Sequence, residues 1–396
     1  MMQISPETQL FIREHSSDDV RVLALQAKKY PDIDMPTAIT QIAGRKVAAE
    51  KIPSWWEIEK IWYPKHLSLE QCSSEITARY KARLLQGDSL TDLTGGFGID
   101  CSFLATGFKS ATYVERQEEL CEIAAHNFPV LNLNHINIKN EDGVTYLQAM
   151  SPVDCLFLDP ARRNEHGGKT VAISDCEPNV AELEELLLQK ANRVMIKLSP
   201  MLDLSLALKE LKQTQEVHIL SVNNECKELL ILLGQTSPAE ISIHCVNLFT
   251  KGTQKEQHFV FTREQEQCSE CTYTDSLETY LYEPNASLLK AGAFRSIAAA
   301  YPVRKLHPNS HLYTSDTFIE NFPGRIFRIV NQCSFNKKEV KENLADLKKA
   351  NVTVRNFPAT VAELRKRLHL TEGGDTYLFA STLNNGQKVI IRCEKV

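Results

Sequence analysis

The sequence predicts an α/β protein with a doubly wound parallel sheet, a helical region before it and a smaller α+β region after it. Two observations support this fold class. Between residues 89 and 234, short apolar runs alternate with helical segments, as in a parallel sheet with helices on both faces. From about residue 276 the composition changes, because Pro284 to Leu306 holds four basic residues and no acidic one. At 396 residues the chain is too long for one ordinary core.

Residues 1–66 form the predicted helical region, since apolar residues recur at helical spacing in "DDVRVLALQA" and "MPTAITQIAGRKVAAEK". All three tryptophans lie between Pro53 and Pro64, and we expect them to serve packing rather than ligand binding. A further helix is predicted over 70–85, with Ser68 and Gln71 as its capping box.

The central segment, 67–275, is predicted to be a Rossmann-like core of seven strands with additional edge strands. Six of the seven are expected to be parallel, and they span 89–94, 110–115, 136–142, 153–160, 193–200 and 216–222. Residues 226–234 are expected to add the seventh strand, antiparallel and at an edge. Helices are predicted at 100–107, 116–131, 143–150, 179–191 and 202–213.

Two small segments complete the expected organisation, 276–322 and 323–396. In the second, the pattern predicts a strand, a helix, a strand, a helix and two final strands, which is typical of a small α+β domain.

Composition limits the classes of function. No apolar run approaches the roughly 20 residues that span a bilayer, and no secretory signal is visible at the N-terminus. Eleven scattered cysteines suit free thiols in a reducing cytoplasm. The pair Cys268 and Cys271 has no second pair to complete a zinc site, and His126, His135 and His166 lack ligand spacing, so we expect no metal site. A net charge of −5 means that a nucleic-acid partner would need a local basic face.

The turn after the first predicted strand carries the strongest chemical signal. Gly95, Gly96 and Gly98 allow the backbone to turn tightly against a ligand, and Glu115 ends the next strand 17 residues beyond Gly98. A carboxylate in that position can accept both hydroxyls of an adenosine ribose. The third glycine of a dinucleotide fingerprint is missing, and no Gly-Lys-Ser/Thr follows as in a P-loop. Asp92, just before the turn, suits a cationic amino group, which S-adenosylmethionine has and a pyrophosphate lacks.

These strand ends resemble the motifs of class I S-adenosylmethionine-dependent methyltransferases. More narrowly, "LEQCSSEITARYKA", "DLTGGFGID", "LDPARRN", "EPNASLLKAG" and "EGGDTYLFAST" resemble the bacterial methyltransferases with a THUMP-like C-terminal domain preceded by a ferredoxin-like segment. The resemblance implies S-adenosyl-L-methionine as the cofactor. It implies methionine, ribose and adenine contacts from Asp92, Thr94, Gly95, Gly96, Phe97, Gly98, Glu115 and Asp142, with Ser73, Ser74, Thr77 and Lys81 as candidates for closing over the methionine carboxylate.

Asp159 and Pro160 are the residues that this resemblance places at the methyl-acceptor pocket, and Arg162 and Arg163 could clamp a phosphate or carboxylate. Amine methyltransferases typically carry a second proline and an aromatic residue here, which this chain lacks. The alternative for Asp159 is a helix N-cap or a salt bridge to Arg162. Lys197, at another strand end, is more often structural than catalytic.

RNA, either tRNA or rRNA, is the substrate that the THUMP-like region implies. The four basic residues between Pro284 and Leu306, with the nine Lys/Arg against four Asp/Glu in 336–369, are predicted to form its binding face. Two alternatives stay open: a non-catalytic RNA-binding or assembly protein that keeps the cofactor pocket, and a methyltransferase of proteins or small molecules.

Overall fold

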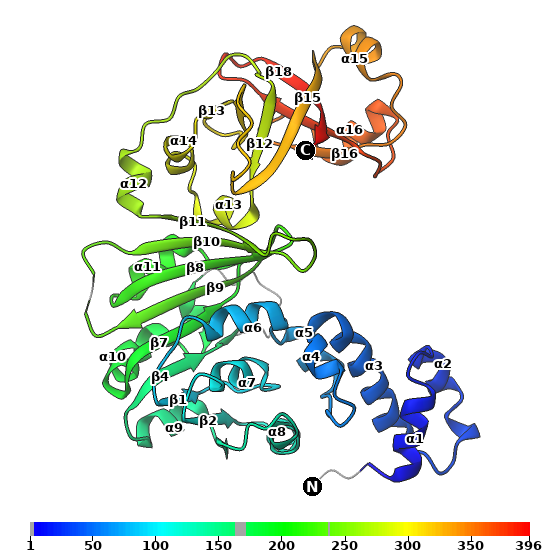
Figure 1. The fold of residues 1–396 in the computed structure, drawn as a ribbon, viewed down its shortest axis with the longest axis vertical. Helices are drawn as coiled ribbons and strands as arrows, with labels where there is room; N and C mark the ends of the chain where they lie inside the picture. Colours follow the sequence, from blue (N-terminus) through cyan, green and yellow to red (C-terminus); the bar gives the residue numbers. More distant parts are fainter. Residues whose placement is uncertain (1–3, 163–171, 237) are drawn as a thin grey trace. The chain divides into compact units, whose positions relative to one another are not determined.

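The computed structural model describes residues 4–162, 172–236 and 238–396 (Figure 1). The chain divides into two compact units, and each is described by itself. Unit 1 comprises Met1–Gln215 and Leu229–Pro238, and unit 2 comprises Glu216–Glu228 and Ala239–Val396. No helix in the described parts of the chain is both long and apolar enough to cross a membrane.

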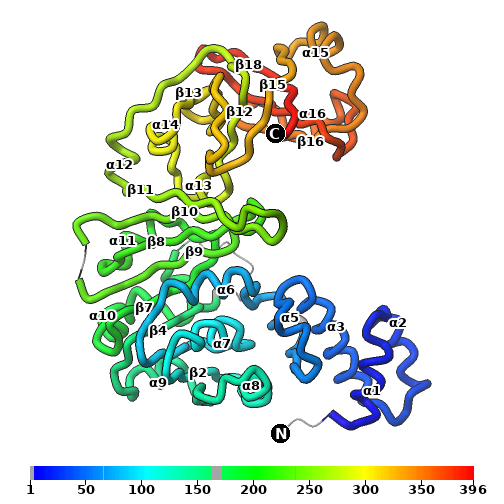
Figure 2. Tube along the Cα trace, viewed as in Figure 1, coloured from blue at the N-terminus to red at the C-terminus, as the bar shows by residue number. Residues whose placement is uncertain are grey.

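Unit 1 begins with the predicted helical region, which is confirmed (Figure 2, blue). Its helices are α1 (Pro6–Glu14), α2 (Val20–Leu25), the 3-10 helix η1 (Ala27–Lys29), α3 (Met35–Lys51) and α4 (Pro53–Trp56). Side chains of Ser5, Asp19 and Asp34 cap three of them. Two of the three tryptophans serve packing as predicted: Trp55 is buried edge-on against Phe97, and Trp62 stacks on His126.

The large sheet has the strand order β11-β10-β8-β9-β7-β4-β1-β2-β3. Its strands in unit 1 are parallel except β9, which runs antiparallel to β7. β9 is the predicted seventh strand, but it lies between β7 and β8 in the order and not at an edge. The bounds are β1 (Ser89–Asp92), β2 (Ser110–Glu115), β3 (Ile136–Asn140), β4 (Val153–Leu158), β7 (Ala191–Leu198), β8 (Thr214–Val222) and β9 (Glu225–Gly234).

Helices alternate with these strands as the sequence predicts. They are α5 (His66–Gln71), α6 (Glu75–Ala82), α7 (Ile99–Ala105), α8 (Glu118–Val130), α9 (Gly143–Ala149), α10 (Val180–Lys190) and α11 (Leu204–Glu210). A short two-stranded sheet pairs β5 (Ala161–Arg162) with β6 (Cys176–Glu177), and the 3-10 helix η2 (Ile173–Asp175) precedes β6.

The predicted single helix over 70–85 and its Ser68 cap are wrong. The chain is extended at Cys72, so α5 ends at Gln71 and α6 starts at Glu75, with Ser74 as its N-cap. The break has a physical reason, because it turns the Ser73 hydroxyl toward a buried carboxylate, described below, instead of leaving it on a helix surface.

Unit 2 adds β10 (Ser242–Leu248), parallel to β8, and β11 (Glu256–Phe261), antiparallel to β10, followed by α12 (Arg263–Cys268). A second sheet has the order β13-β14-β12-β15-β18-β17-β16. Its strands are β12 (Tyr280–Pro284), β13 (Arg304–Lys305), β14 (Tyr313–Ser315), β15 (Gly324–Ser334), β16 (Asn351–Val354), β17 (Thr376–Thr382) and β18 (Lys388–Lys395). The helices are α13 (Ala286–Ala291), α14 (Ser296–Ala300), α15 (Lys337–Leu344) and α16 (Val361–Leu368).

The predicted order of the last region, strand, helix, strand, helix, strand and strand, is confirmed by β15 to β18. β12 pairs with β15, so one sheet joins the segments before and after residue 323. A shared apolar core follows from this pairing, since Leu281 of β12, Phe327 of β15 and Phe379 of β17 pack in one buried cluster.

Candidate active site at the carboxyl ends of the strands

The topological switch of the parallel sheet lies between β1 and β4, because β2 and β3 extend to one side of β1 while β4 and β7 extend to the other. In doubly wound sheets, ligands bind outside the carboxyl ends of the strands at such a switch. The two strands end at Asp92 and just before Asp159, so the switch brings together two carboxylates that the sequence predicts for the site.

The glycines of the turn after β1 are needed for two reasons. At one position a neighbouring side chain leaves no room for a Cβ, and at two others the backbone conformation favours glycine. A Cβ on Gly95 would meet the Tyr113 ring at 2.2 Å, so this position is closed to any side chain by packing. Gly96 has φ +54° and Gly98 has φ +86°, conformations that favour glycine. At Gly96 the nearest atom to a Cβ would be the Thr94 carbonyl oxygen at 3.8 Å, which leaves room for a ligand beside the backbone.

The Glu115 carboxylate is hydrogen-bonded to this turn. Its Oε2 accepts a hydrogen bond from the Gly96 N–H at 2.8 Å, and its Oε1 accepts one from the Gln117 N–H at 2.9 Å. The Tyr113 hydroxyl, on the same strand, donates to the Gly96 carbonyl. The predicted juxtaposition of Glu115 and the glycines is therefore confirmed, and each carboxylate oxygen keeps a second lone pair for a hydroxyl.

Asp92 carries the most unusual carboxyl group of the site. Its Oδ1 accepts the Thr94 N–H at 3.0 Å, whereas its Oδ2 is buried and has no hydrogen-bond partner among the residues that the structure describes. Burial, together with the charges of Asp100 and Asp159, raises the pKa of Asp92 to about 8. Buried polar atoms are almost always paired, so this oxygen indicates a missing donor or cation.

Two buried lysines converge on Asp100, in the first turn of α7. Lys81 Nζ lies 3.0 Å from Asp100 Oδ1, and Lys197 Nζ lies 3.3 Å from Oδ2. The Ser73 hydroxyl donates to Oδ2 at 2.7 Å and accepts from both ammonium groups, at 3.0 Å and 3.1 Å. Burial alone would raise the pKa of Asp100, but the two lysines and the hydroxyl lower it to about 2.

Lys197 also pairs with Asp159, so the network reaches the end of β4. The Asp159 side chain is 36% exposed and Lys197 only 11%, which places the exposed end of the network at the carboxylate. The Asp159 N–H donates to the Thr94 hydroxyl at 2.6 Å, which joins the ends of β1 and β4. None of the described helices is capped by Asp159, since β5 follows it at Ala161–Arg162, so the N-cap alternative is wrong for the described residues. The side chain of Arg162 lies outside them, and so does the alternative of a salt bridge to it.

Sequence reasoning missed Asp100 and undervalued Lys197. Asp100 sits inside a helix that follows the glycines, and only the folded chain brings it to lysines 19 residues before it and 97 residues after it. An acidic residue in the first turn of a helix is common, because it interacts favourably with the helix dipole, so the position of Asp100 alone does not mark it as buried. Ser73 is among the predicted candidates, but for the methionine carboxylate and not for its contact with Asp100.

Of the other predicted site residues, Asp142 is exposed, whereas Lys81, Thr77, Phe97 and Pro160 are buried. Asp142 is exposed and caps α9, because its Oδ1 accepts the N–H groups of Val144 and Thr145. Lys81 is fully buried, and the buried Thr77 hydroxyl donates to the Ser74 carbonyl. Phe97 and Pro160 are buried, Arg162 lies in β5, and Arg163 falls outside the described residues.

Comparisons with known proteins now identify the family. Residues 280–323 match a ferredoxin-like domain and residues 324–395 match a THUMP domain-like family. A solved structure from Porphyromonas gingivalis W83, a proposed methyltransferase, is 34% identical with a TM-score of 0.88, and the match covers 100% of both chains. The chain belongs to the bacterial family of class I methyltransferases with a THUMP-like C-terminal domain.

Further solved structures match less of this methyltransferase-family chain. An rRNA methylase from Streptococcus thermophilus is 15% identical with a TM-score of 0.30, over 40% of this chain and 93% of that one. A proposed methyltransferase from Streptococcus mutans in complex with SAH is 13% identical with a TM-score of 0.30, over 40% and 96%. With TM-scores of 0.30, these two matches say nothing about the function of this chain. A comparison with curated proteins found no match.

The predicted basic face of this family member is wrong in part. Lys305 is buried, with its ammonium donating to the Pro308 carbonyl at 2.8 Å and lying over the Phe294 ring. Arg304 pairs with Glu278 but stays exposed, so only the part of the prediction that concerns Lys305 is wrong. A two-residue strand hid this from the sequence, because its inward face cannot be identified without the sheet. Within 336–369, the stretch of the THUMP-like domain that the prediction names, seven basic residues are exposed: Lys337, Lys338, Lys341, Lys348, Lys349, Lys366 and Arg367.

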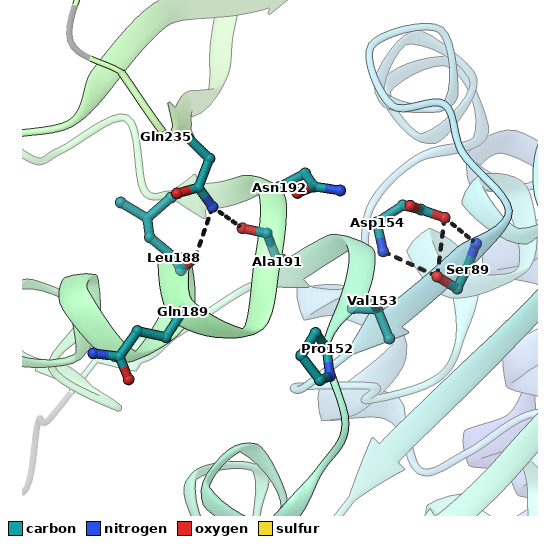
Figure 3. Close-up of a pocket in the computed structure, with 9 residues that line it drawn as sticks. All are labelled: Ser89, Pro152, Val153, Asp154, Leu188, Gln189, Ala191, Asn192 and Gln235. Atoms are coloured by element: carbon teal, nitrogen blue, oxygen red, sulfur yellow. Dashed lines mark hydrogen bonds between the residues drawn. The ribbon is translucent and has the colours of Figure 1, made fainter.

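A pocket at the opposite edge of the sheet has a different character (Figure 3). It is lined by Ser89, Pro152, Val153, Asp154, Leu188, Gln189, Ala191, Asn192 and Gln235, at or near the amino ends of β1, β4 and β7. Two of its polar groups are already bonded: Asp154 Oδ2 accepts from Ser89, and the Gln235 side-chain amide donates to two carbonyl groups. This pocket lies at the opposite end of the strands from Asp92, Glu115 and Asp159.

Proposed function

We propose that this protein is an S-adenosylmethionine-dependent methyltransferase that acts on RNA. The observation that carries the proposal is the orphan Oδ2 of Asp92, buried at the switch point beside a glycine with open space next to its backbone. A cationic amino group is the partner that such a carboxylate needs, and the methionine end of the cofactor has one. When bound, S-adenosylmethionine supplies an electrophilic methyl group.

The residues of the chain suit the rest of this cofactor. Glu115 offers free lone pairs for ribose hydroxyls, and the Gly96 N–H, which it holds, fixes the turn in place before binding. Asp142 stays a proposed adenine contact, and its exposed side chain retains a second oxygen beyond the one that caps α9. Preorganisation of this kind lowers the entropic cost of binding.

The acceptor is best explained as an oxygen atom. An amine gains positive charge as it is methylated, and the Lys197 ammonium beside Asp159 would oppose that charge. A hydroxyl that gives up its proton develops negative charge, which the same ammonium stabilises, while Asp159 accepts the hydrogen bond from the hydroxyl. Lys81 and Asp100 hold Lys197 in place from behind. The absence of a second proline and an aromatic residue after Pro160 agrees with this choice.

The RNA part of the proposal rests on the THUMP-like domain and on its exposed basic residues. Phosphate contacts by lysine and arginine make affinity fall steeply with salt. Reversing the charge of Lys337 and Lys338 should weaken RNA binding and flatten the salt slope by about one unit per lost contact. Lys255→Glu, an exposed lysine of the same unit outside this domain, is the matched control.

The deciding experiment incubates the purified chain with methyl-labelled S-adenosylmethionine and with RNA, protein or metabolite fractions from cells that lack the gene. Label in RNA, followed by mass spectrometry showing an O-methylated nucleoside, is the expected result. An N-methylated base would overturn the acceptor assignment alone. Label in protein or metabolites would overturn the RNA substrate. RNA binding without transfer would support a non-catalytic assembly role.

A further inference from the structure

Three histidines and a glutamate gather on one face of unit 2, on strands β8, β10 and β11. His218 and His244 are direct partners in the parallel pairing of β8 and β10. Glu216 precedes His218 by two residues and so points to the same face. On β11, His258 pairs with Val246, two residues beyond His244, which places it on that face as well.

Glu216, His218 and His244 lie at the distances of a metal-ligand set, and His258 adjoins His244. His244 Nδ1 lies 3.2 Å from His258 Nε2, and His218 Nε2 lies 3.2 Å from Glu216 Oε2. One ligand atom each from Glu216, His218 and His244 lies within 4.8 Å of the others. A tetrahedral ion with bonds of about 2.0–2.1 Å needs its ligand atoms about 3.3 Å apart, so the two short pairs already match that spacing.

The burial of these histidines and the orientation of their rings are compatible with a metal ion that binds from solvent. His218 is buried and His258 is exposed, so the set opens toward solvent on the β11 side. The His218 and His244 rings are stacked at 4.3 Å and 15°, and a bound ion would require them to turn so that both lone pairs point at it. Rotation of an imidazole about its second side-chain torsion is soft, so this adjustment is small.

From this arrangement we propose a divalent transition-metal site formed by His218, His244, His258 and Glu216, with Zn²⁺ as the ion that fits best. Three imidazole nitrogens and one carboxylate oxygen suit zinc, and an ion here would cross-link β8, β10 and β11. The sequence analysis expects no metal site, and the proposal departs from that expectation because the sheet brings together residues that are separated along the chain. This site is independent of the proposed methyl transfer.

The test uses the full-length protein after dialysis against a chelator, titrated with Zn²⁺ alone by calorimetry and with Co²⁺ by absorption spectroscopy. We expect one equivalent to bind, with a tetrahedral Co²⁺ spectrum and a raised melting temperature. His258→Ala and His244→Gln should each weaken binding at least about tenfold, since each removes a ligand. His258 is exposed, so its replacement should leave the fold intact.

Two controls separate this site from other metal-binding groups. His369→Asn removes an exposed histidine of the same unit at a left-handed position that asparagine tolerates, and it should change nothing. Cys268→Ser with Cys271→Ser removes the paired thiols. The proposal is wrong if no saturable binding occurs, if the histidine variants bind as the parent does, or if Co²⁺ shows thiolate charge-transfer bands that the cysteine variant loses.

Discussion

The two edges of the parallel sheet in unit 1 differ in how a carboxyl group is hydrogen-bonded. At the amino edge, Asp154 Oδ2 accepts three hydrogen bonds, from the N–H groups of Asp88 and Ser89 and from the Ser89 hydroxyl. At the carboxyl edge, Asp92 Oδ2 accepts none from the described residues. A satisfied carboxylate joins two strands, whereas a buried and unsatisfied one costs stability unless something binds it. The contrast supports the carboxyl edge as the proposed functional edge without reference to any relative.

The two edges of the sheet also differ in how exposed their charged pairs are. The amino edge has exposed pairs such as Lys109 with Asp88, which solvent screens. The carboxyl edge holds Lys81 and Lys197 out of water, and Asp100 is the group that pairs with both. Burying two ammonium groups is tolerable only while their partner stays ionised.

The largest effect is expected for Asp100→Ala. The substitution leaves Lys81 buried without its carboxylate and should lower the free energy of unfolding by about 3–5 kcal/mol. Chemical denaturation at neutral pH measures the loss. Asp88→Ala, which breaks an exposed pair, is the control and should produce no clear change.

A rescue variant makes this prediction sharper. Replacing the buried pair together, as Lys81→Met with Asp100→Leu, should recover most of the stability, because apolar groups of similar size fill the space and Lys197 keeps Asp159. If the double variant is as unstable as Asp100→Ala, the loss comes from packing and the electrostatic account fails.

The next effect separates chemistry from stability. If Asp159 orients the acceptor as proposed, Asp159→Ala should reduce methyl transfer at least about a hundredfold while cofactor affinity stays nearly the same. Asp154→Ala, at the other edge, should leave transfer unchanged. Equal rate losses in the two variants would show that Asp159 acts through the fold alone. Calorimetry with S-adenosylmethionine provides the binding measurement.

The sequence predicted the strand ends well and their connections poorly. Asp92, Gly96, Glu115 and Asp159 are all set by local patterns, since each follows an apolar run that the alternation of strands and helices marks. The link from Lys81 through Asp100 to Lys197 is tertiary, and no local pattern encodes it. The same limit explains the misplaced Ser68 cap.

Cofactor binding should report the ionisation of Asp92 directly. With a pKa raised to about 8 by burial, the Asp92 carboxyl is about nine-tenths protonated at pH 7 in the free protein. A cationic amino group placed against it would lower that pKa, so binding should release close to one proton. Calorimetry in buffers of different ionisation enthalpy measures the release. Asp92→Asn should abolish it, and an unchanged proton count in that variant would contradict the assignment.

The last effect is a pair of opposite pH dependences. The raised pKa of Asp92 means that the folded chain holds a proton which the unfolded chain loses near pH 4. Its contribution to stability is fully present below about pH 4 and is lost as the pH rises toward 8. Hydrogen bonds from Ser89 and Asp88 lower the pKa of Asp154. Its contribution is therefore present above about pH 4 and is lost as the pH falls through its lowered pKa.

Two variants expose these slopes in denaturation series from pH 3 to pH 8. The advantage of the parent chain over Asp92→Asn should shrink as the pH rises, and its advantage over Asp154→Ala, about 1 kcal/mol at neutral pH, should shrink as the pH falls. Subtracting each variant from the parent cancels the titration of all other groups. Parallel slopes would mean that both carboxyl groups are structural, and the contrast between the two edges of the sheet would then no longer identify the functional one.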